Sequence, residues 1–121
     1  MNGVWVALGI AAAGGVGAAA RHLVDNSLPD RVRERFPWGI MVINLTGSFV
    51  LGILVGLSLE HPIASVLSGG LLGGYTTFST ASLDTVRLLA ARRPVAALFN
   101  GPGMLVLAIA LAGAGILLAR A

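Results

Sequence analysis

Four long stretches of this 121-residue chain contain no Asp, Glu, Lys or Arg. They hold 20, 24, 22 and 26 residues and cover 1–20, 36–59, 62–83 and 94–119. A helix rises about 1.5 Å per residue and a bilayer core is about 30 Å thick, so each stretch is long enough to cross once. The sequence therefore predicts an all-α membrane protein, a single transmembrane domain over 1–121 with four transmembrane helices. We expect these helices at about 3–22, 36–59, 62–84 and 95–119.

Composition narrows the function classes. Hydrophobic residues make up 56% of the chain and charged residues 11%, too apolar a balance for the surface of a small water-soluble domain. So little chain lies outside the four stretches that we expect no enzyme. Cysteine is absent, which excludes disulfides and thiolate metal sites. The net charge of +3 comes from arginines beside apolar stretches, so we expect a membrane partner and no nucleic acid.

The arginines are distributed unequally between the two sides of the predicted bundle. Seven flank the first and third connections, and one, Arg120, falls on the side of the termini. Because cytoplasmic loops carry the excess of basic residues, this places both connections in the cytoplasm and both termini outside. Within the first connection, 31–35 is interpreted as a short interfacial helix or, equally well, as a solvated linker.

The third stretch has paired glycines, Gly73 and Gly74, at its midpoint, followed by a polar cluster over 75–80. Such a pair lets the backbone leave helical geometry, and carbonyls freed at that depth need a ligand or a protein partner. Unwound carbonyls in transporters hold sodium, so a hard monovalent cation is one prediction. The alternative is a packing kink whose hydroxyls bond back to the preceding turn.

The second stretch carries polar and small residues near its centre. Asn44 must find a partner for its amide at that depth, either as a contact between helices or along a wet path. Ser48, Gly52 and Gly56 recur every four residues, a pattern that marks close helix packing and favours an oligomer. Neutral donors, with the positive ring edge of Phe78, suit a small anion that binds weakly enough to leave.

Three motifs in order resemble the Fluc/CrcB family of fluoride channels. The first is Gly14-Gly15-x-Gly17-Ala18-x-x-Arg21, and the second runs from Pro37 through Asn44 to Gly47-Ser48-Phe49 and Gly52. The third and most specific is Gly73-Gly74-x-Thr76-Thr77-Phe78-Ser79-Thr80. The resemblance implies a fluoride-selective channel in the cell membrane that exports fluoride passively and lowers its toxicity in the cytoplasm.

The resemblance also implies an assembly and site residues. The assembly is an antiparallel dimer with fluoride pores along the subunit interface. A structural sodium ion at its centre is held by backbone carbonyls of the broken third helices, here those of Gly73 and Thr76. The residues implied to line the fluoride path are Asn44, Phe78, Ser79 and Thr80. Arg21 matches an arginine of the first motif, to which we assign a structural or vestibular role.

The chain departs from the family pattern at two places. Ala81 stands where a second pore phenylalanine is usual, and the fourth stretch reads 99–104 as Phe-Asn-Gly-Pro-Gly-Met, without the usual hydroxyl. Asn100 is the polar residue that could line the path there. Together with the arginine bias, these departures suggest one subunit of a heterodimer with an oppositely oriented paralogue, rather than a homodimer. Such a subunit could be non-conducting, or it could be partly degraded in the sense that some pore residues have been lost.

A small antiparallel multidrug exporter is a further alternative. Proton coupling in such an exporter needs a carboxylate inside the membrane, and the four stretches contain none.

Overall fold

The computed structural model describes residues 2–121, whose regular elements are all helices. Two of them, η1 and η2, are π-helical. In chain order they are α1 (Gly3–Asn26), α2 (Asp30–Arg35), α3 (Trp38–Leu57), α4 (Ile63–Ser65), η1 (Val66–Leu72), α5 (Gly73–Tyr75), α6 (Phe78–Ala90), α7 (Pro94–Leu98), η2 (Phe99–Gly103) and α8 (Met104–Arg120).

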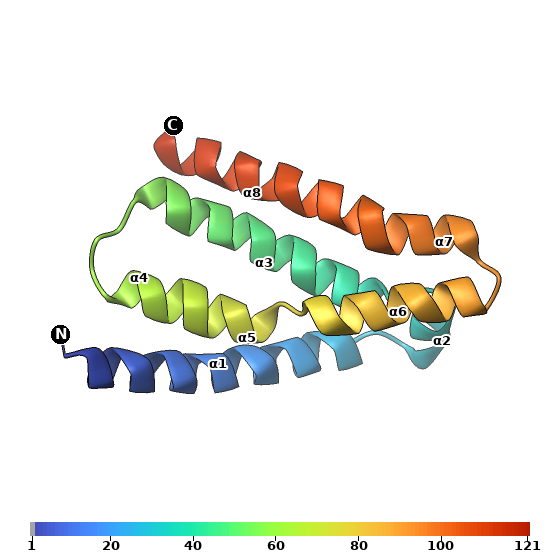
Figure 1. Cartoon of the computed structure of the whole chain (residues 1–121), viewed down its shortest axis with the longest axis horizontal. Coiled ribbons are helices and arrows are strands. Elements are labelled where there is room, and N and C mark those ends of the chain that lie inside the picture. The colour runs from blue at the N-terminus through green and yellow to red at the C-terminus, as the bar shows by residue number, and fades with distance from the viewer. Residues whose placement is uncertain (1) are drawn as a thin grey trace.

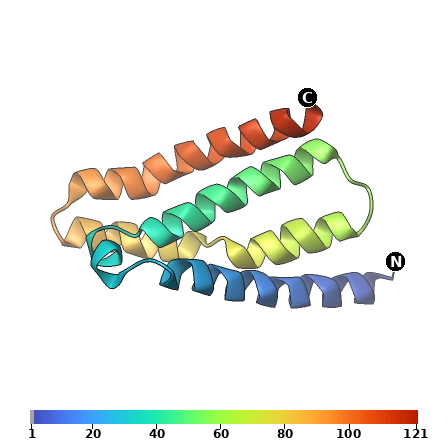
Figure 2. The ribbon, with the colours of Figure 1, turned by 180° about the vertical axis from the view of Figure 1, so that it is seen from behind.

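The longer helices run roughly along a common long axis (Figure 1). α3 packs against α8, while α1 packs against η1 and α5. Both termini and the connection between α3 and α4 lie at one end of the bundle. α2 and the connection between α6 and α7 lie at the other, as the view from behind also shows (Figure 2). The two arginine-rich connections therefore share one end.

Three helical segments are long and apolar enough to cross a membrane: Gly3–Asn26, Trp38–Leu57 and Pro94–Arg120. Their outward side chains are apolar as well, with Val95 80% exposed and Leu117 73% exposed. A soluble protein does not leave so much apolar helix surface uncovered. The chain is therefore a multi-pass membrane protein.

Glycines bring helices of this chain into close contact. A Cβ added at Gly52 would overlap the carbonyl of Ala112 on α8, and one at Gly56 would lie 2.7 Å from the carbonyl oxygen of Ile116. The predicted close packing on this face is confirmed. These glycines pack inside the chain, between α3 and α8, so the oligomer stays a prediction that this pattern no longer supports.

The paired glycines of the third stretch are helical, contrary to the prediction that they unwind. Gly73 has φ −61° and ψ −38°. Gly74 instead allows α1 to approach, since a Cβ there would overlap the Gly14 backbone. The residues that leave helical geometry come next: Thr76 and Thr77 are extended, with ψ of 158° and 121°.

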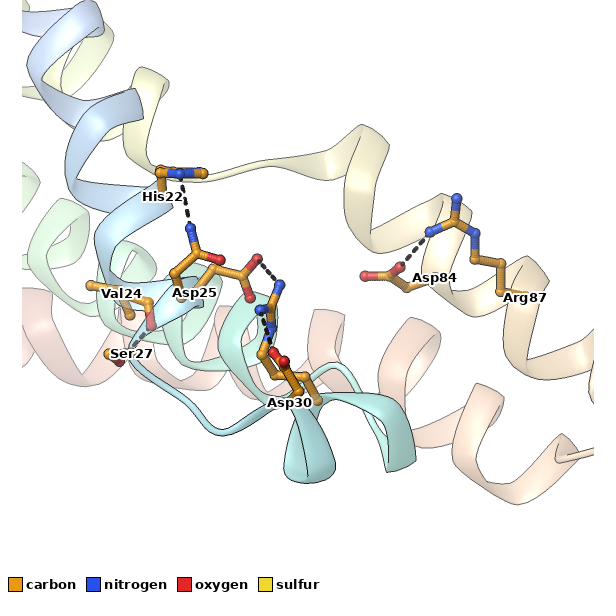
Figure 3. A network of polar contacts seen from close by, with 9 residues as sticks. His22, Val24, Asp25, Ser27, Asp30, Asp84 and Arg87 are labelled. Carbon is orange, nitrogen blue, oxygen red and sulfur yellow. Dashed lines mark hydrogen bonds and ion pairs between the residues drawn. The ribbon is translucent and has the colours of Figure 1, made fainter.

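The first connection forms a helix, α2, instead of a wholly irregular linker. Arg33 ties this helix to α1, with its guanidinium 3.4 Å from the Asp25 carboxylate and 3.5 Å from that of Asp30. Figure 3 shows both carboxylates at the end of α1 and the start of α2. These contacts fix α2 against the bundle.

Candidate functional site

An amide on α3 holds the extended residues between α5 and α6. The Asn44 Oδ1 accepts from the Thr77 N–H, and the Asn44 Nδ2 donates to the Thr77 carbonyl, each at 2.9 Å. Extended backbone at membrane depth has no water to satisfy it. One side chain therefore replaces both missing backbone partners of Thr77. This contact between helices is one of the two roles predicted for Asn44.

The second N–H of Asn44 has only a weak acceptor. Its Nδ2 lies 3.3 Å from the sulfur of Met104 on α8, and a thioether accepts hydrogen bonds poorly. The neighbouring hydroxyl of Ser48 is already used, because it donates to the Asn44 carbonyl at 2.7 Å. On this face of α3, the second N–H of Asn44 is therefore the donor that can most easily exchange its acceptor for a better one.

The two carbonyls predicted to hold a cation, those of Gly73 and Thr76, are among the carbonyls released where the helix breaks. The Thr77 N–H, which would otherwise continue the helical pattern onto the Gly73 carbonyl, goes to Asn44. The Thr80 N–H, which would reach the Thr76 carbonyl, goes to the Thr77 hydroxyl at 3.2 Å. Neither carbonyl therefore accepts a helical N–H.

Arg21 lies inside α1 and not in the first connection. Its Nη1 donates to the Thr76 carbonyl at 3.4 Å, so a positive group already faces one of the released carbonyls. The contact ties α1 to the extended segment. It also leaves six arginines, instead of seven, at the end of the bundle that carries α2.

A cavity of about 650 Å³ runs beside the extended residues, between α3, α6 and the fourth stretch. Its lining is mostly apolar with a few polar groups, the usual character of a small-ligand site. The predicted residues that line it are Asn44, Gly73, Thr76, Phe78 and Asn100. Ser79 and Thr80 are not lining residues of this cavity.

Phe78 begins α6 and is 86% exposed. Its ring stands directly after the extended residues, on the cavity and open to the surroundings of the chain. Residues 2–121 leave this large apolar ring uncovered, so it can contact a ligand in the cavity or a second chain.

A second group of polar atoms lies further along the cavity. The amide of Asn100, in η2, donates to the Ala81 carbonyl at 3.2 Å and to the Thr85 hydroxyl at 2.9 Å. Asn100 is 1% exposed, and its Oδ1 has no partner among residues 2–121.

The prediction gave Thr77 and Thr85 no role. Their spacing of four from Ala81, on one helix face, is the signal that could have found them.

The sequence matches a known family and individual proteins over most of its length. The family model described as "CrcB-like protein, Camphor Resistance (CrcB)" matches residues 8–116. A Leifsonia xyli protein named "Fluoride-specific ion channel FluC 1" is 48% identical over 92% of this chain and 84% of its own. "Fluoride-specific ion channel FluC 2" of Mycobacterium tuberculosis is 41% identical over 90% and 85%. "Fluoride-specific ion channel FluC" of Nitrobacter winogradskyi is 40% identical over 93% and 94%. With this coverage and identity, the chain belongs to the CrcB family.

Proposed function

We propose that this chain is a subunit of a fluoride channel that lets fluoride leave the cell passively across the cell membrane. Family membership and three relatives named as fluoride-specific ion channels support fluoride as the transported ion. The observation that carries the mechanism is the Asn44 amide, held at the extended segment beside a largely apolar cavity.

The amide offers fluoride a donor without loss of the fold. Fluoride is a strong hydrogen-bond acceptor, so it replaces the Met104 sulfur at the second N–H while the bonds to Thr77 stay in place. The donor is neutral, which keeps binding weak enough for release. The edge of the Phe78 ring carries positive potential and assists at the same level.

The segment over 62–84 is proposed as the third of four membrane spans, interrupted at Thr76 and Thr77. The helices on either side cover 63–75 and 78–90, and each is shorter than a bilayer core of about 30 Å. Together they are long enough to cross. Two termini at one end of the bundle support an even number of spans.

The chain is proposed to pair with an oppositely oriented partner, a paralogue rather than a second copy. Six arginines at one end and one at the other favour a single orientation, whereas an antiparallel homodimer needs both. The exposed ring of Phe78 supports a partner on that face. Ala81 leaves one ring missing, which the partner would supply.

Sodium is proposed as a structural ion between the two chains. The Gly73 and Thr76 carbonyls of this chain would hold it together with oxygens of the partner. This chain would thus supply two of the oxygen ligands, and the partner would supply the others. Bound there, the ion would stabilise carbonyls that no helix uses. The hydrogen bond from Arg21 to Thr76 would then have to lengthen or break.

Fluoride efflux from liposomes tests the proposal. We expect Phe78→Ile, in the presence of the partner, to slow fluoride efflux about tenfold because the ring edge is lost while bulk is kept. Trp5→Phe, on α1 at the far end of the bundle, serves as the control and should conduct normally. Unchanged efflux in Phe78→Ile would favour a passive subunit.

A further inference from the structure

The short helix α2 carries a basic hollow beside the membrane end of α3. The hollow is lined by Arg31, Val32, Arg35 and Trp38. The acidic residues of α2, Asp30 and Glu34, do not line it. Arg31 and Arg35 are four residues apart, so their side chains share one face of the helix.

The two arginines of the hollow are not used in ion pairs within the described part of the chain. Among residues 2–121, neither Arg31 nor Arg35 forms an ion pair, whereas Arg33 takes both Asp25 and Asp30. Arg93 also lies beside α2, because its Nη1 donates to the Arg35 carbonyl. Like charges on one helix face repel each other, and an anion between them removes that repulsion.

Trp38 fixes the hollow at the depth of the membrane surface. The centroid of its ring system lies 4.7 Å from the ring centroid of Phe36 and 6.3 Å from that of Phe99. The residue is 42% exposed. Tryptophan is enriched at the membrane interface, with the indole among the lipid headgroups. This preference puts the hollow within reach of lipid headgroups.

We propose that the hollow binds the phosphate of an anionic phospholipid from the cytoplasmic leaflet. Basic pockets at the ends of membrane helices bind such headgroups, and charge complementarity selects an anionic lipid over a zwitterionic one. The site lies away from the Asn44 cavity, so it adds a lipid contact to the chain and does not depend on fluoride conduction.

Quenching of Trp38 fluorescence by brominated lipids tests the proposal on the full chain in nanodiscs. The chain has two tryptophans, so Trp5→Phe leaves Trp38 as the single reporter. We expect brominated phosphatidylglycerol to quench at a concentration roughly fivefold lower than brominated phosphatidylcholine. Equal quenching by the two lipids would overturn the proposal.

Two double variants separate the hollow from general surface charge. Arg31→Gln with Arg35→Gln should abolish the preference for phosphatidylglycerol, and the pair of Lys replacements should keep most of it. Arg87→Gln with Arg92→Gln removes the same charge at the same end of the bundle and should leave the preference intact. Loss in both Gln pairs would overturn the proposal in favour of diffuse attraction.

Inorganic phosphate distinguishes a lipid from a soluble anion. Added to the buffer, it should leave quenching by phosphatidylglycerol unchanged. If it removes the preference, the hollow takes free phosphate and the assignment to lipid is wrong.

Discussion

At the scale of single residues, Asn44 has the most demanding position in the chain. Its amide satisfies both backbone groups of Thr77 and still presents one N–H to a poor acceptor. A side chain that stabilises the fold and offers a donor must have both amide atoms, so we expect that an isosteric acid does not replace it.

Asn44→Asp should cut fluoride efflux at least about tenfold, because a lost hydrogen bond to a charged group costs about 1.5–3 kcal/mol. The added carboxylate also repels an anion. The measurement is electrode-recorded efflux from liposomes, with Thr46→Val as the control. Thr46 is two residues along the same helix and its hydroxyl bonds back to the Val42 carbonyl. Full efflux from Asn44→Asp would show that the amide does not carry the ion.

Thr77 caps α6 through its hydroxyl, which accepts from the Thr80 N–H. Thr77→Ala should lower the free energy of unfolding by about 1 kcal/mol, the usual value of a helix N-cap. Thermal unfolding in detergent measures the change. Thr77→Ser keeps the hydroxyl and should retain most of the stability; equal losses in both variants would assign the effect to the methyl group instead.

The position of the extended residues could not be predicted from the sequence, although the polar cluster around them could. The paired glycines suggested unwinding at Gly73 and Gly74, but the backbone leaves the helix at Thr76 and Thr77. That choice depends on Asn44, which lies 33 residues away in the sequence. A local pattern contains no information about such a pairing.

At the scale of helices, α3 and α8 can approach closely because glycines, which have no side chain, line the contact. The spacing of Ser48, Gly52 and Gly56 correctly predicted a packed face. It could not predict whether the neighbouring helix belongs to this chain, because small residues permit either contact. The structure assigns the face to α8.

Gly52→Ala should destabilise the chain by about 1–3 kcal/mol, since the new methyl overlaps the Ala112 carbonyl. Gly113→Ala is the matched control on the facing helix, because nothing lies within 4 Å of its added Cβ. The control should gain about 0.5–1 kcal/mol from helix propensity. Thermal unfolding of both variants in one detergent is the measurement, and equal stability would contradict the packing.

At the scale of the whole molecule, charge separates the two ends of the bundle. The prediction that the arginine-rich connections share one end agrees with the structure, because the direction of each helix follows from the short connections. The count changed by one, since Arg21 is bound inside the bundle to the Thr76 carbonyl. The remaining bias still favours one orientation in the membrane.

Single-cysteine labelling tests that orientation directly, because the chain has no cysteine of its own. Ser58→Cys lies in the connection between α3 and α4, and Ala91→Cys in that between α6 and α7. A membrane-impermeant thiol reagent should label the first in intact cells and the second only after permeabilisation. Partial labelling of both in intact cells would mean two orientations and would favour a homodimer.

The most direct test of the central claim compares fluoride with chloride efflux from liposomes that hold this chain. The chain purified together with its native partner should release fluoride rapidly and chloride at the leak rate. The chain alone should stay near the leak rate for both ions, because its single orientation leaves it without an antiparallel partner. Rapid fluoride release from the chain alone would contradict the paralogue requirement. Equal release of the two ions, or no fluoride release with the partner present, would contradict a fluoride-selective channel.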